Sequence, residues 1–258
     1  MATNNRFTSP LSLLQRRPGI KASIALANDL TAAIVRGALQ PGARLPTEEE
    51  LIEQSGYSRS TVRESLRVLE REGLVEIRRG ASGGLFVRRP DNAGIARSLH
   101  LLVQFNRDDP RVILEARREL ESLCARLAAT RISPTEVKRL RESVRRLSAI
   151  RESHTAANEN LAFHLQVVGA TRNPVLQALV GAVRSLLFDR TLDIYASPEK
   201  IRDAARAHGK IVDALEARNA ALAAHRMTKH LAAFEQYLIE TRQIDRLLDP
   251  SVAIAGSP

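Results

Sequence analysis

The sequence predicts a mostly α-helical protein that is divided into two domains. Apolar residues recur at helical spacing through most of the chain, whereas the segments LVEI and LFV, residues 74–77 and 85–87, alternate like strands. Pro, Gly and Asn separate the helical segments. Aromatic residues make up only 3% of the 258 residues and Trp is absent, so Leu, Ala and Val must fill the core.

Two helices are predicted near the start of the chain, and the second of them is short. Apolar residues at helical spacing predict one helix over residues 20–39, which the Pro41-Gly42 pair ends. Thr47, followed three residues later by Glu50, predicts a capping box at the start of the second helix. Gly56 is expected to end this helix, because glycine readily takes the left-handed conformation of a tight turn.

The third helix is predicted from Ser58 to Gly73 and has two different faces. The apolar face is expected to pack on the first two helices and consists of Val62, Leu66 and Leu69. The other face is basic and carries Arg59, Ser60, Arg63 and Arg67. The strand pair that follows turns at Gly80, Gly83 and Gly84. Three helices and a hairpin within about 70 residues predict an N-terminal winged helix-turn-helix.

This arrangement predicts that the protein binds double-stranded DNA. Arg59 and Arg63 share a helix face, and arginine forks suit guanine edges as well as phosphates. Phosphates are also expected at the helix N-terminus, where they can bond the hydroxyls of Ser58, Ser60 and Thr61. The wing adds Arg78, Arg79, Arg88 and Arg89. The formal net charge of +10 agrees with a polyanionic partner, and a solvated basic face is the alternative for any single arginine.

The remaining chain predicts a C-terminal all-α bundle of about seven helices. Ser133, Asn173 and Ser197 each precede a proline and are expected as N-caps, and a break is expected near His154. The predicted organisation is a disordered segment over 1–18, the winged domain over 19–89, a linker over 90–95, the helical domain over 96–247 and a flexible tail over 248–258.

The composition also bears on compartment and covalent chemistry. Cys124 is the only cysteine, so neither an intrachain disulfide nor a cysteine zinc cluster is expected. There is neither a recognisable signal peptide nor an apolar run of about 18 residues. The sequence therefore predicts a cytoplasmic protein that has no membrane partner.

Three of the six histidines lie on apolar helix faces and are expected to point into the bundle. The turn at Arg218-Asn219 makes residues 200–217 and 220–243 an antiparallel hairpin, which places His208 and His230 at the same height. His164 is the third, and Asn160 lies one turn before it on the same face. Inward histidines at one level of a bundle predict a metal site. Three separate core histidines, each with its own hydrogen-bond partner, are the alternative.

Residues 22–89 resemble the DNA-binding domain of the GntR family of bacterial transcription regulators. The resemblance lies in GALQPGARLPTEEEL, YSRSTVRESLRVLEREGLVE and RRGASGGLFV. It implies base and phosphate contacts by Arg59 and Arg63, support from the hydroxyls of Ser58, Ser60 and Thr61, and a wing contact at Gly80. The chain departs from the family at Glu49, where arginine is common, so a phosphate contact is not expected there.

Residues 95–240 resemble the all-helical effector domain of the FadR subfamily, called FCD, through LEARRELESLCARLAATR, NLAFHLQVVGATRNPVLQAL and AHGKIVDALEARNAALAAHRMTKHL. The resemblance implies a divalent metal held by His164, His208, His230 and Asn160. Asn160 stands where the family has Asp, which lowers the expected affinity, and zinc, nickel and manganese all suit such a site. A small carboxylate metabolite beside the metal is also implied, with Arg117 and Arg184 as its candidate ligands. A salt bridge is the alternative role for Arg117.

These features together predict a ligand-responsive transcription regulator, in most such proteins a repressor, that binds a near-palindromic operator as a homodimer. One alternative is a DNA-binding protein whose helical domain is inert and serves only dimerisation. A metal-dependent hydrolase is a second alternative. Neither a placed general base nor a familiar catalytic signature accompanies the histidines, so the protein is not expected to be an enzyme.

Overall fold

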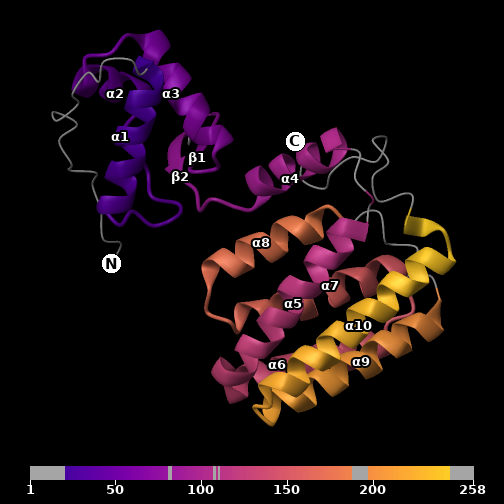
Figure 1. The fold of residues 1–258 in the computed structure, drawn as a ribbon. Coiled ribbons are helices and arrows are strands. Elements are labelled where there is room, and N and C mark those ends of the chain that lie inside the picture. Colours follow the sequence, from indigo (N-terminus) through magenta and orange to yellow (C-terminus); the bar gives the residue numbers. More distant parts are fainter. Residues whose placement is uncertain (1–20, 81–82, 107–108, 110, 188–196, 245–258) are drawn as a thin grey trace. The chain divides into compact units, whose positions relative to one another are not determined.

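The computed structural model describes residues 21–80, 83–106, 109, 111–187 and 197–244, and it divides the chain into two compact units between Gly94 and Ile95 (Figure 1). The predicted terminal segments, 1–18 and 248–258, lie outside the described residues. The described part is mostly helical, as the sequence predicts.

The first unit contains three helices and a two-stranded antiparallel sheet. Its elements are α1 (Ala22–Arg36), α2 (Glu48–Ser55), α3 (Arg59–Arg71), β1 (Val75–Arg78) and β2 (Gly84–Val87). The strands pair from Val75 opposite Val87 to Arg78 opposite Gly84. This order of elements confirms the winged helix-turn-helix fold.

Local signals in the sequence set the ends of α2 and α3. The Thr47 hydroxyl accepts from the Glu50 amide at 3.2 Å, and the Glu50 carboxylate accepts from the Thr47 amide at 2.7 Å, which completes the predicted capping box. Gly56 follows α2 with a φ of 67°, in the left-handed region. Ser58 caps α3. The predicted apolar face of α3 is buried with α1 and with the strands, through Val62, Leu66 and Leu69.

The second unit is formed by helices that pack around buried aliphatic side chains. The helices that the structure describes here are α4 (Ala93–Asn106), α5 (Arg111–Arg131), α6 (Pro134–Ala149), α7 (Ser153–Gly169), α8 (Pro174–Ser185), α9 (Pro198–Glu216) and α10 (Ala220–Glu240). Their number agrees with the prediction of about seven helices. α9 and α10 lie antiparallel and side by side, and α10 also packs along α5 (Figure 1).

The helix ends differ from prediction in two places. Residues 93–95 of the predicted linker are helical, because the Asp91 carboxylate accepts from the Ala93 amide at 2.9 Å and starts α4. The break expected near His154 lies just before this residue, where the Glu152 carboxylate caps α7. Ser133 and Asn173 cap their helices as predicted, whereas Ser197 precedes Pro198 without forming a side-chain capping bond.

Candidate functional site

Three histidines from three helices converge inside the second unit. The Nε2 atom of His230 on α10 lies 3.2 Å from Nε2 of His208 on α9 and 3.3 Å from Nε2 of His164 on α7. His164 and His208 are fully buried, and His230 is half-buried. The α9–α10 hairpin therefore brings His208 and His230 to one level, as the helical spacing predicts.

The spacing of the three nitrogens suits a metal ion. Histidine nitrogens bind zinc at about 2.0–2.1 Å, which places two such ligands roughly 3.3 Å apart in a tetrahedral set. The two separations recorded here are close to that value. Without a cation, His230 Nε2 can donate only one proton while it faces two other ring nitrogens, so a shared cation satisfies the cluster better than hydrogen bonds do.

Asn160 supplies an unsatisfied oxygen on the same face of α7. Asn160 is 5% exposed, and its Oδ1 atom has no hydrogen-bond partner among the described residues. Leaving a buried amide oxygen unpaired costs about 1–3 kcal/mol. Asn160 precedes His164 by four residues, one helical turn. The donor set therefore fits a metal held by three imidazoles with an amide oxygen on the neighbouring turn.

Glu121 connects the histidine cluster to a buried group of charges. Its carboxylate accepts from Arg117 Nε at 2.9 Å and from Arg184 Nη1 at 2.7 Å, and its other oxygen contacts His164 Nδ1. Glu121 is 1% exposed. Because Nδ1–H of His164 donates to Glu121, Nε2 of this ring keeps its lone pair and faces the other two histidines. Such a carboxylate–histidine contact is a common way to orient a metal ligand.

The two arginines predicted to hold an effector therefore lie together but already have a partner. Arg117 on α5 and Arg184 on α8 are both buried, and Arg117 also lies over the ring of Phe234, 4.7 Å from its centroid. Sequence reasoning missed Glu121, although the Arg117–Glu121 spacing of four residues on one helix was a usable signal.

Burial and neighbouring charges decide the protonation of this cluster. Burial lowers the pKa of His164 to about 4, against the opposing charge of Glu121. Burial and the neighbouring positive groups also hold the pKa values of His208 and His230 well below the ordinary value. Burial raises the pKa of Glu121, but Arg184, His164 and Arg117 together bring it well below its usual range. The cluster consequently presents neutral imidazoles and an ionised carboxylate, the forms that bind or support a metal.

The predicted DNA-reading face of α3 is exposed, and its arginines pair with acidic residues of α2 and of α3 itself. Arg63 Nε donates to both carboxylate oxygens of Glu48, at 2.9 and 3.1 Å. Arg59 lies 3.5 Å from Glu48 and 3.8 Å from Glu49, and Arg67 lies 3.9 Å from Glu64. These exposed pairs are worth little in water, so phosphates or bases can replace the carboxylates at small cost.

The hydroxyls at the start of α3 bond to one another. Ser58 Oγ lies 2.9 Å from both Ser60 Oγ and Thr61 Oγ1, and it accepts from the Thr61 amide at 3.3 Å. Ser58 therefore has a structural role in capping α3, and a phosphate contact remains a prediction for all three residues.

The wing presents its predicted DNA-binding residues to solvent. Arg79 and Gly80 are exposed, and Gly80 has a φ of 100°, which a side chain rarely adopts. Arg78 bonds Glu76 at 2.9 Å and covers the ring of Phe86. Arg79 is therefore exposed at the end of β1, and its contact with DNA remains a prediction.

Each of the two units matches the sequence model of a known protein family. Residues 23–87 match the model described as bacterial regulatory proteins, gntR family, and residues 112–233 match the FCD domain. In the described ranges, every helix is too short or too polar to cross a bilayer.

Individual relatives cover most of the chain. It is 30% identical over 225 residues to the Uxu operon transcriptional regulator of Escherichia coli strain K12, covering 82% of this chain and 84% of the relative. It is 29% identical over 211 residues to the HTH-type transcriptional regulator LutR of Bacillus subtilis strain 168, covering 80% of this chain and 95% of the relative. The structure of Streptococcus agalactiae GntR shares the fold, with a TM-score of 0.63 at 22% identity over 83% of this chain and 99% of that chain. The chain therefore belongs to the GntR family of bacterial regulatory proteins, and with its FCD domain it is a DNA-binding transcription regulator and not an enzyme.

Proposed function

We propose that this regulator is controlled by a small organic acid that binds beside a divalent metal in the helical unit. The observation that supports this most directly is the convergence of His164, His208 and His230, with the unpaired oxygen of Asn160 one helical turn before His164. We further propose that it acts as a homodimeric repressor in the cytoplasm, with two winged units on the half-sites of a near-palindromic operator.

The proposed metal site combines nitrogen and oxygen donors. His164, His208 and His230 would hold zinc, nickel or manganese, and Asn160 would add a neutral oxygen in place of a carboxylate. When bound, the cation supplies attraction for a carboxylate oxygen of the effector. Glu121 keeps the Nε2 lone pair of His164 available to the metal.

The proposed switch is an exchange of carboxylates. Arg117 and Arg184 donate to Glu121 in this structure, so an effector carboxylate that binds either arginine must share or replace that contact. The exchange alters how α5 and α8 are tied to α7, which carries His164. A ligand changes operator affinity only if it binds one arrangement of the dimer better than the other.

The proposed DNA interface uses the exposed face of α3 and the wing. Arg59, Arg63 and Arg67 would contact bases and phosphates from the major groove, with Arg79 and Gly80 at the adjacent backbone. Ser58, Ser60 and Thr61 would bind phosphate at the N-terminus of α3.

Metal analysis and operator titration test these proposals separately. Mass-spectrometric metal analysis is performed on protein purified without chelator or added metal, for the natural chain and for the Asn160→Asp and His208→Ala variants. We expect about one equivalent per chain, retained in Asn160→Asp and reduced in His208→Ala. Operator DNA selected from a random pool is then titrated with and without small carboxylates. Absence of metal from both the natural chain and Asn160→Asp would contradict the metal proposal.

A second candidate is a DNA-binding protein whose helical unit is inert. It is favoured by one observation, the occupation of both buried arginines by Glu121. This candidate requires that operator affinity is the same with every carboxylate tested, even at saturating concentration, whereas the first proposal requires a change.

A further inference from the structure

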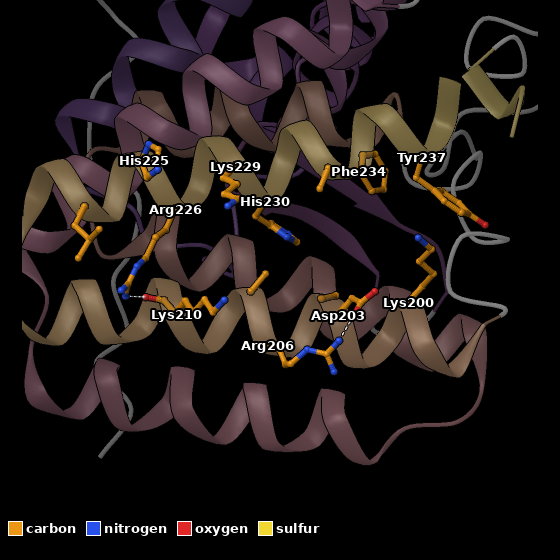
Figure 2. A pocket seen from close by; sticks show the side chains of 14 residues that line it. Lys200, Asp203, Arg206, Lys210, His225, Arg226, Lys229, His230, Phe234 and Tyr237 are labelled. Atoms are coloured by element: carbon orange, nitrogen blue, oxygen red, sulfur yellow. Dashed lines mark hydrogen bonds and ion pairs between the residues drawn. The ribbon is translucent and has the colours of Figure 1, made fainter. Parts of the chain in front are cut away.

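A groove that is open to solvent runs between α9 and α10 and reaches the histidine cluster at His230. It encloses about 460 Å³ and is lined only by residues of these two helices (Figure 2). Small-molecule sites typically measure about 300–1,000 Å³. The groove is therefore large enough to hold an organic metabolite.

The walls of the groove are strongly basic. Its cationic residues are Lys200, Arg206, Lys210, Arg226 and Lys229, and its acidic residue is Asp203. Asp203 is paired with Arg206, and Arg226 donates to the backbone carbonyl of Lys210. In the described part of the chain, no carboxylate pairs with the ammonium groups of Lys210 and Lys229. Positive charges facing one concave space repel one another, and a bound anion removes that repulsion.

The floor of the groove is apolar and adjoins the metal-binding cluster. Ala204, Ala207 and Phe234 line it together with the half-buried ring of His230. Behind Phe234 lies Arg117, and behind His230 lie His208 and His164. Figure 2 shows His230 directed from α10 into the space between the two helices. A ligand in the groove can therefore contact one of the three histidines without entering the bundle.

We infer that this groove binds an organic acid with at least two anionic groups joined by a carbon backbone. Lys210 and Lys229 provide the charge for the anionic groups, and the Ala204, Ala207 and Phe234 surface accepts the carbon backbone. A single carboxylate would engage only part of this charge. The inference adds a site that is separate from the buried Arg117 and Arg184, and only its regulatory consequence rests on the proposed function.

Direct binding to the full-length protein tests the inference without DNA. Isothermal titration compares succinate, which carries two carboxylates, with butyrate, which has the same four-carbon chain and only one. The groove variant is Lys210→Gln/Lys229→Gln, and the matched control is Lys138→Gln/Arg139→Gln, which removes two exposed charges from α6 outside the groove. We expect succinate to bind at least about tenfold more tightly than butyrate, and only the groove variant to lose about tenfold in succinate affinity.

Two results would overturn the inference. Equal succinate affinity in the groove and control variants would mean that net charge, not the groove, attracts the anion. Weaker operator binding by the groove variant alone, with succinate affinity unchanged, would assign these lysines to the DNA backbone instead.

The same measurements separate this inference from the regulatory proposal. Succinate that binds through Lys210 and Lys229 but leaves operator affinity unchanged would support the groove and contradict control by such ligands. An operator response to carboxylates that is identical in the groove variant and the natural protein would support control through another site and contradict a regulatory role of the groove.

Discussion

Replacing Glu121 by Gln is expected to destabilise the helical unit strongly. The substitution keeps the size and shape of the side chain but removes the negative charge that Arg117 and Arg184 share. The side chains of Glu121, Arg117 and Arg184 are 1%, 6% and 7% exposed, respectively. Water therefore cannot replace the lost charge, and the amide nitrogen of the substituted side chain would face groups that are themselves donors.

The size of the effect follows from the burial of the charges. Removing one partner from a buried ion pair costs about 3–5 kcal/mol, because the remaining charge is uncompensated. Domains are stable by about 5–15 kcal/mol in total, so this loss is a large share. By contrast, Asp213 pairs with Arg141 at 2.7 Å, with side chains that are 53% and 39% exposed. Asp213→Asn, the same carboxylate-to-amide change, is expected to cost about 0–1 kcal/mol.

Urea unfolding followed by far-ultraviolet circular dichroism measures both variants against the natural protein. We expect a much lower midpoint for Glu121→Gln, with Asp213→Asn close to the natural value. A loss below about 1 kcal/mol in Glu121→Gln would refute the assignment of these arginines to a charge-balanced cluster.

Three further predictions concern other parts of the chain. Arg63→Ala should weaken binding to a selected operator by about 1–3 kcal/mol in a fluorescence-anisotropy titration, and unchanged affinity would remove Arg63 from base recognition. Burial and the nearby carboxylate of Glu121 raise the pKa of Cys124 to about 12. Iodoacetamide at about pH 8 should therefore label it only after unfolding; labelling of the native protein at the unfolded rate would contradict this. Burial raises the pKa of Glu136, but bonds from Ser133 and Arg172 bring it below its ordinary value. The ionised Glu136 carboxylate therefore stabilises the fold. Its contribution is present above the ordinary carboxyl pKa and is lost as the pH falls through the lowered pKa of the folded state. The difference in Tm between the natural protein and Glu136→Gln should therefore shrink in acid. A difference in Tm that does not change with pH would contradict a stabilising role of the ionised Glu136 carboxylate.

The helices of this protein were predictable because their signals are local. Thr47 and Glu50 form a capping box with groups only three residues apart, and Gly56 needs only its own backbone to take a positive φ. The linker is one exception, since Asp91 starts α4 earlier than the polar composition of this segment suggests. Composition describes a segment as a whole, whereas one side-chain hydrogen bond decides where a helix begins.

The convergence of His208 and His230 was also predictable, because a short turn between two helices fixes which residues face one another. The partner of Arg117 and Arg184 was not. Arg184 lies 63 residues from Glu121 in the sequence, and no local pattern says that α8 places its guanidinium on a carboxylate of α5.

The sequence alone determined the winged helix-turn-helix, the helical bundle, and the histidines that point inward, because these depend on spacing within one helix or across one turn. The tertiary structure alone decided that Glu121 occupies both candidate effector arginines, that Asn160 retains an unpaired oxygen, and that a basic groove adjoins His230. These features depend on the packing of α5, α7, α8, α9 and α10 against one another. Burial and charge arise from side chains that are distant in sequence, so they appear only when the helices are assembled.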